Sequence, residues 1–188
     1  MNVKSLLFIL GLLGAQSAWG SLLFSFSQQA DGVHVDVSGT VNTSALTAGG
    51  TSAFSADTSL APAEKAVYVV QGTTPTLTVY DLTYGTLQPF GKITSANGTW
   101  LSGTIGMDTS GYTDFLFLDP NYVSGSPLTA SAIFPGTYAT YGFPGGSIVD
   151  QLPGNQTITL YFSPEPSTWT TAAGALVLTL WAARRRRR

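Results

Sequence analysis

His34 is the only histidine of the 188-residue chain, and Asp36 follows it two positions later. Residues i and i+2 of a strand share one face, so this pair could move a proton between imidazole and carboxylate. A serine hydrolase would also need an activated nucleophile, but the chain has no G-x-S-x-G motif. We therefore interpret His34 and Asp36 as solvent-facing strand residues and assign no catalytic residue.

The carboxylates give two further options for chemistry. Glycoside hydrolysis by a carboxylate pair is conceivable, but the nine acids between positions 21 and 163 include one Glu, and no aromatic cleft motif surrounds a charged residue. The segment Asp108 to Asp114 presents oxygen atoms around a glycine and could hold Ca²⁺. It lacks the spacing and terminal Glu of an EF-hand loop, and an Asx turn explains it more simply. The absence of cysteine removes disulfides and Cys-ligated zinc, and we assign no metal and no cofactor.

The elements that would position these residues are strands. Val, Thr, Phe and Tyr recur with period-2 alternation in short runs, and Gly, Pro, Asn and Asp clusters separate them. No sustained 3.6-residue period occurs between the ends of the chain. This pattern predicts an all-β domain over residues 21–163, either an antiparallel β-sandwich or a jelly-roll-like body. Residues 44–62 are expected to form a long loop, with a short helix as the alternative. The expected strands cover residues 23–27, 33–37, 65–71, 76–82, 99–105, 112–118, 137–141 and 156–162.

The charge of this domain differs from that of the whole chain. The chain has a formal net charge of −2, but residues 21–163 contain two lysines against nine acids, which gives −7 with His34 neutral. Nucleic-acid affinity comes mainly from neutralising phosphates with Lys and Arg. We therefore exclude nucleic acid as a partner.

The N-terminal residues predict export. Lys4 precedes the apolar run from Leu6 to Leu13, and Ala18 and Gly20 supply small residues at positions −3 and −1 before Ser21. This is the layout of a secretory signal peptide over residues 1–20. Because positive charge stays on the cytoplasmic side, we expect Lys4 and the C-terminal arginines to remain cytoplasmic and the chain between them to be exported.

The C-terminal tail has three parts. Pro164, Glu165 and Pro166 form a segment that disfavours a helix, and the 16 residues from Thr168 to Ala183 carry no charge. A helix of this length spans about 24 Å, less than a hydrocarbon core of about 30 Å, which favours a transient transmembrane anchor. The chain then ends on an unbroken cationic cluster: Arg184, Arg185, Arg186, Arg187 and Arg188.

This order of motif, short apolar helix and arginine cluster resembles the PEP-CTERM sorting signal of Gram-negative bacteria. The resemblance covers residues 164–188. It implies that exosortase, a membrane enzyme associated with exopolysaccharide and biofilm systems, processes the tail at Pro164, Glu165 and Pro166. It also implies that the arginine cluster retains the precursor in the membrane until cleavage.

Three functions therefore remain open. The first is a non-catalytic surface or extracellular-matrix protein, transiently anchored and then held at the cell surface or outside the cell, in contact with extracellular polysaccharide. The second is a carbohydrate-binding module that stacks exposed aromatic rings on sugars, for which Trp100, Tyr138 and Tyr141 are the candidate residues. The third is a polysaccharide-active hydrolase, which would need His34 and Asp36 in a cleft.

Overall fold

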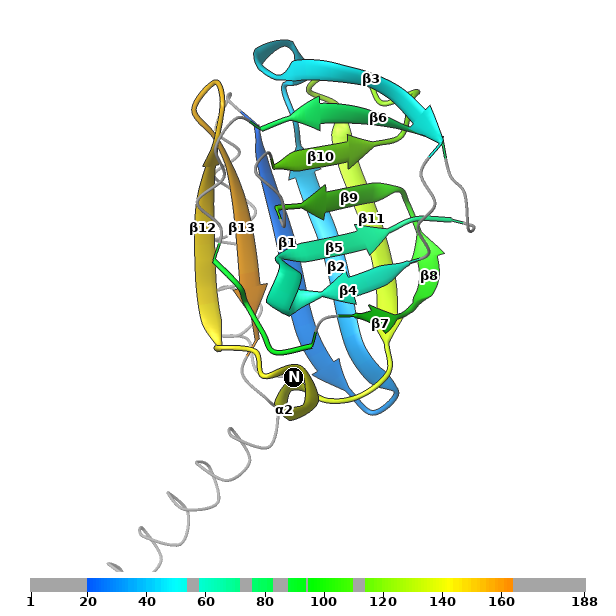
Figure 1. Ribbon diagram of the computed structural model, residues 1–188, viewed down its shortest axis with the longest axis vertical. Coiled ribbons are helices and arrows are strands. Elements are labelled where there is room, and N and C mark those ends of the chain that lie inside the picture. Colours follow the sequence, from blue (N-terminus) through cyan, green and yellow to red (C-terminus); the bar gives the residue numbers. More distant parts are fainter. Residues whose placement is uncertain are drawn as a thin grey trace, which may run out of the picture.

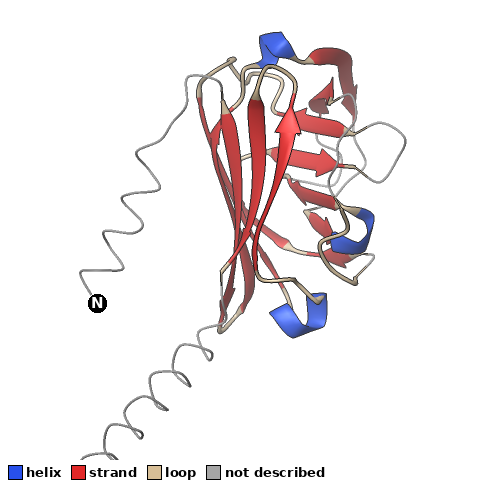
Figure 2. Cartoon of the chain, turned by 90° about the vertical axis from the view of Figure 1, so that its left-hand side faces the viewer, coloured by secondary structure: helices blue, strands red, loops and turns tan. Residues whose placement is uncertain are grey.

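The computed structural model describes residues 20–53, 58–71, 76–82, 88–93, 95–109 and 114–163. In this part the chain is all-β, and its strands form two sheets that face each other. Figure 2 shows the two layers from the side. In Figure 1 the strands of the front sheet run across those of the sheet behind, which is the arrangement of orthogonally packed sheets.

The six-stranded sheet, which we call sheet A, contains the two longest strands of the described chain. All its pairs are antiparallel except that of β1 with β13, which is parallel. Its strands are, in spatial order, β12 (Gly146–Leu152), β13 (Gln156–Phe162), β1 (Ser21–Gln29), β2 (Gly32–Thr40), β11 (Pro127–Phe134) and β8 (Thr99–Ser102).

The seven-stranded sheet, sheet B, is antiparallel throughout and is built from shorter strands. Two 3₁₀ turns, η1 (Thr43–Ala45) and η2 (Pro62–Glu64), lie beside β3 and β5 in the chain. The strands of sheet B are, in spatial order, β3 (Thr47–Ala53), β6 (Thr76–Asp81), β10 (Phe115–Leu118), β9 (Ile105–Asp108), β5 (Ala66–Val69), β4 (Ser59–Ala61) and β7 (Ala96–Asn97).

The main core lies between the sheets. Alternate residues of β1 and β2 point inward, as the sequence pattern predicts, and meet the inward residues of β5, β9 and β10. Phe24 and Phe26 are fully buried, and the Phe26 ring stacks on that of Phe162 with 4.7 Å between centroids. Because Phe26 and Phe162 are register partners on β1 and β13, this contact stabilises the pairing within sheet A, and the burial of both rings adds apolar free energy to the core between the sheets.

The prediction of a strand over residues 137–141 is wrong. Residues Tyr138–Tyr141 form a one-turn helix, α2. Thr137 caps its first turn in a capping box with Thr140, and Gly142 ends it in the left-handed conformation at φ 69°. Because Tyr138 and Tyr141 are three positions apart, one helical turn buries both rings, which a strand could not do on a single face.

The prediction of a long loop over residues 44–62 is also wrong in part. This segment contains β3 and β4, built largely from Ser, Thr, Ala and Gly. Such small residues carry little alternation, so only pairing with β6 and with β5 identifies the strands. The expected run 99–105 divides between β8 and β9, which belong to different sheets.

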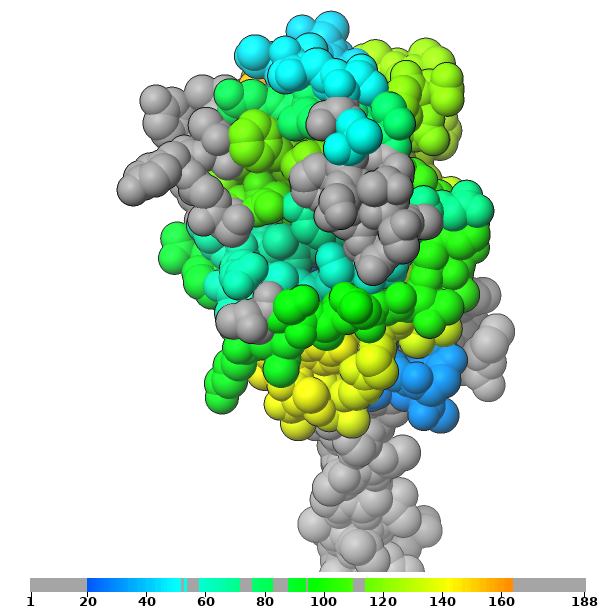
Figure 3. All heavy atoms as spheres, turned by 45° about the vertical axis from the view of Figure 1, so that its right-hand side comes forward, coloured from blue at the N-terminus to red at the C-terminus, as the bar shows by residue number. Residues whose placement is uncertain are grey.

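The parallel pair separates the two ends of the domain. β1 and β13 run in the same direction from Ser21↔Thr157 to Phe26↔Phe162, so Gly20 and Ser163 lie at opposite ends of sheet A. The backbone N–H of Ser163 donates to Phe26 O at 2.9 Å. Figure 3 shows that this end also carries the α2 segment (yellow) beside the turn between β1 and β2 (blue). We call it the α2 end.

Candidate functional site

The structure places His34 and Asp36 on one face of β2, as expected, but pairs His34 with a different acid. His34 Nε2 lies 2.8 Å from Asp31 Oδ1, in the turn before the strand. The hydrogen bond from His34 holds the pKa of Asp31 below its ordinary value. Ser27 lies opposite His34 on β1, and all of these residues belong to the outer face of sheet A rather than to a cleft.

Tyr138 and Tyr141 do not offer the exposed rings that a glycan contact needs. They are only 6% and 1% exposed. The hydroxyl of Tyr138 donates to Phe26 O, and that of Tyr141 donates to Pro135 O at 2.7 Å. Both rings pack against Phe143, with 5.2 Å between centroids in each case. These tyrosines therefore pack α2 against the end of sheet A. Burial also raises the pKa of Tyr141.

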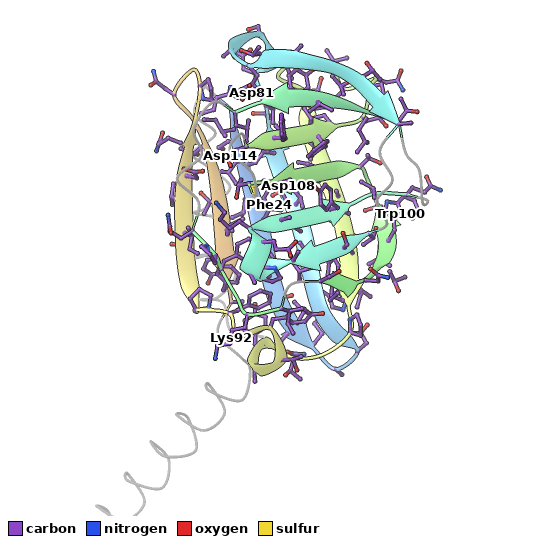
Figure 4. All side chains as sticks on the ribbon, viewed as in Figure 1. Phe24, Asp81, Lys92, Trp100, Asp108 and Asp114 are labelled. Atoms are coloured by element: carbon purple, nitrogen blue, oxygen red, sulfur yellow. The ribbon has the colours of Figure 1, made fainter. Side chains whose placement is uncertain are left out.

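Trp100 is half-buried on the edge strand β8, at the opposite side of sheet A from β12. Its indole Nε1–H donates to Gly103 O at 2.6 Å, and its ring packs against the main core. Figure 4 shows it at the edge of the molecule, away from α2, so the three predicted aromatic residues do not form one surface.

The segment Asp108 to Asp114 is described only at its ends, since residues 110–113 lie outside the described residues: Asp108 ends β9 and Asp114 immediately precedes β10. Asp81 and Asp108 both lie opposite Phe115, on strands either side of β10 (Figure 4). Asp108 Oδ2 accepts a hydrogen bond of 2.6 Å from Tyr68, whose pKa is raised by burial and by this bond. Within the described residues, no three acids or histidines approach closely enough to hold a metal ion.

Sheet A presents a different outer surface, which sequence reasoning did not single out. Register places one residue from each strand in a row: Ser147, Tyr161, Ser25, Asp36, Ser131 and Ser102. The hydroxyls of Ser102 and Ser131 lie 3.2 Å apart, which shows that both point the same way. With neighbouring strands about 4.8 Å apart, the row crosses about 24 Å of sheet.

A neighbouring row extends this surface with three more hydroxyls and two aliphatic side chains. It carries Val149, Thr159, Leu23, Ser38 and Thr129, each opposite the next. We call the two rows together the hydroxyl face. The alternation that identified β1, β2 and β13 as strands also indicates which of their residues point outward. The register between strands far apart in the sequence was needed to align these residues into rows.

The described residues form a hollow at each end of the domain. One of about 420 Å³, at the α2 end, is lined by Lys92, Tyr138, Phe143 and Ser163 among others. Figure 4 shows Lys92 beside α2. The other, of about 430 Å³, lies at the far end and is lined by Asp119, Asn121 and Tyr122 among others. Tyr122 is held there by hydrogen bonds with Val41 and Ser126, and burial raises its pKa.

The predicted signal peptide, except Gly20, and the whole predicted sorting tail lie outside the described residues. Among the residues that are described, no helix is long and apolar enough to cross a membrane. Comparison with protein-family models, with curated proteins and with solved structures found no match.

Proposed function

We propose that this chain is a non-catalytic, exported surface or extracellular-matrix protein with a β-sandwich domain, sorted through its C-terminal tail. The observation that carries the proposal is the order of Pro164–Pro166, an uncharged stretch and five terminal arginines. In this account the arginines hold the precursor in the membrane, the prolines keep Glu165 extended outside it, and exosortase cleaves there.

The strand boundaries support this division of the chain. β1 begins at Ser21 and β13 ends at Phe162. Removing residues 1–20 and the tail from Pro164 onward would therefore remove no strand of either sheet. Because Ser163 lies at the α2 end, the anchored precursor would hold that end nearest the membrane.

The test is tail processing in an exosortase-bearing host. Glu165→Ala or Pro166→Ala should leave the precursor anchored and uncleaved, whereas Ser167→Ala, just outside the motif, serves as the matched control. Deleting Arg184–Arg188 should impair both retention and processing. The measurement is the fraction of protein that is released or reduced in mass. If the motif variants are exported and processed like the parent, the tail is an ordinary anchor and the sorting proposal fails.

A second function is carbohydrate binding. The surface that favours it is the hydroxyl face, and not the three aromatic residues that the sequence predicts for this function. The hydroxyl face combines hydrogen-bonding groups from all six strands of sheet A with an exposed tyrosine ring. Carbohydrate binding and tail sorting are compatible, because they use different parts of the chain.

A further inference from the structure

The hydroxyl face is poor in charge although the domain is strongly acidic. Residues 21–163 carry a net charge of −7, yet Asp36 is the one carboxylate in the two rows that define the face. The other described acids lie in turns, at the ends of sheet B strands or, for Asp150, buried in β12. A ligand on this face therefore meets hydroxyls rather than a charged field, and neither an anionic nor a strongly cationic polymer is complementary to it.

The face also has one apolar spot, centred on Tyr161. This residue is 38% exposed, and Val149 on the neighbouring edge strand is 55% exposed. Ser147 and Ser25 lie directly opposite Tyr161, while Val149 and Leu23 are its diagonal neighbours. An aromatic ring bordered by two aliphatic side chains and then by hydroxyls suits a ligand whose rings have apolar C–H faces and polar rims.

The single carboxylate is placed to orient such a ligand. Asp36 is exposed on β2, in the same row as Tyr161 and separated from it by Ser25. The structure gives Asp36 no hydrogen-bond or ion-pair partner among the described residues. Its oxygens are therefore free to accept hydrogen bonds from ligand hydroxyls, and charge-assisted bonds of this kind are the stronger ones.

We propose that the hydroxyl face binds an uncharged polysaccharide, laid across the strands along the row from Ser147 to Ser102. Tyr161 packs against a sugar ring, Asp36 accepts hydrogen bonds from sugar hydroxyls, and the serines complete the polar contacts. The inference deepens the proposed function, since it rests on an exported protein that meets extracellular polymer and names the chemical class of that polymer.

A protein partner fits the same face less well. Stable protein interfaces have an apolar core from which charged residues are depleted, with several aromatic anchors. The two rows of the hydroxyl face supply one aromatic residue, two aliphatic residues and an exposed carboxylate among serines and threonines. Dimerisation of the chain through this face would therefore contradict the proposal.

The experiment measures binding of the full-length chain, purified in detergent, to three neutral polysaccharides and one anionic one. Affinity electrophoresis with dextran, galactomannan and alginate, and pull-down with cellulose, give the apparent Kd for each. We expect binding to at least one neutral polymer. Tyr161→Ala should weaken it about tenfold, which corresponds to about 1.4 kcal/mol, and Asp36→Ala should also weaken it.

Two valines provide a matched pair for this test. Val149→Ser changes the hydroxyl face and should weaken binding, whereas Val123→Ser, at a 67% exposed loop position, should leave it unchanged. Circular dichroism checks that every variant is folded. The proposal is overturned if no neutral polymer binds, if only alginate binds, if the face variants bind like the parent, or if Tyr161→Ala instead abolishes a dimer. None of these results affects the tail-processing assay, so the two proposals can fail separately.

Discussion

The outer faces of the two sheets differ sharply, although both belong to one β domain. On sheet A, the outward residues of β1 and β2 are mainly Ser, Thr, His and Asp, and the inward ones are buried Phe and Val. On sheet B, the outward residues form a second apolar cluster: Ala66, Tyr68, Val70, Leu77 and Phe117. Sheet A is therefore an ordinary one-sided sheet, whereas the central strands β5, β9 and β10 of sheet B are largely buried on both faces.

The difference is visible in the strands themselves. All four residues of β5, Ala66–Val69, are buried, with Val67 and Val69 in the main core and Ala66 and Tyr68 in the second cluster. Continuous apolar runs of this kind are typical of strands that are covered on both faces. Strict alternation is typical of strands with one solvent-exposed face. A surface available to ligands is thus expected on sheet A.

The largest expected effect comes from a pair of leucines on the two outer faces. Leu77→Ala, at a residue with 0% exposure in the second cluster, should lower the free energy of unfolding by about 2–4 kcal/mol. Leu23→Ala, at a half-buried position of the hydroxyl face, should lower it by less than about 1 kcal/mol. Urea unfolding monitored by tryptophan fluorescence measures both. Equal losses would show that the two faces are not different.

A pair of glycines gives the next effect. A Cβ on Gly106 would lie 2.5 Å from Tyr68 Cδ1, because the Tyr68 ring packs over this glycine beside Phe117. Gly106→Ala should therefore displace the ring and cost about 1–3 kcal/mol. At Gly49 on β3 the nearest atom would be 3.5 Å away, so Gly49→Ala is the control and should be tolerated. A tolerated Gly106→Ala would mean that the second cluster is loosely packed.

Alkaline unfolding tests the same cluster through Tyr68. Its pKa is raised by burial and by the hydrogen bond to Asp108, from an ordinary value of 10.0, so the unfolded chain loses this proton first. The stabilisation is complete below pH 10 and is lost as pH rises from there towards the pKa of the folded state, by up to about 1.4 kcal/mol per pH unit.

Tyr68→Phe should reduce this alkaline loss while costing about 1.5 kcal/mol at neutral pH through the missing hydrogen bond. Part of the loss should persist, because burial also raises the pKa of Tyr122 and Tyr141. The measurement is the urea midpoint between pH 8 and pH 11. An identical pH profile for parent and variant would contradict the burial of Tyr68.

The all-β class was predictable because β1, β2 and β13 alternate large apolar residues with polar ones. β11 was missed, since two of its four inward residues are Ala130 and Ala132, which are too small to mark a period. The sequence also gave no sign that β1 and β13 pair in parallel, because residues far apart in the chain make this contact and only the folded topology decides it.

The candidate site was less predictable than the fold. Tyr138 and Tyr141 looked like surface aromatics, but a capped helical turn buries them, and the signal was the Thr137–Thr140 capping box with Gly142 after it. The alternation of β13 is sufficient to predict that Tyr161 points outward. Its importance became clear only when register placed it in one row with Asp36.

The central claim is that sheet A keeps its outer face open while the second apolar cluster on the outer face of sheet B is buried, and thiol labelling tests it most directly. The chain contains no cysteine, so Ser38→Cys on the hydroxyl face and Ala66→Cys in the second cluster each introduce a single reactive group. Labelling of the full-length chain with a maleimide is timed under native conditions and again in guanidinium chloride. Ser38→Cys should react about as fast in both conditions, whereas Ala66→Cys, at a position only 4% exposed, should react far more slowly in the native protein. Equal native rates at the two positions, or protection of Ser38→Cys, would contradict the account.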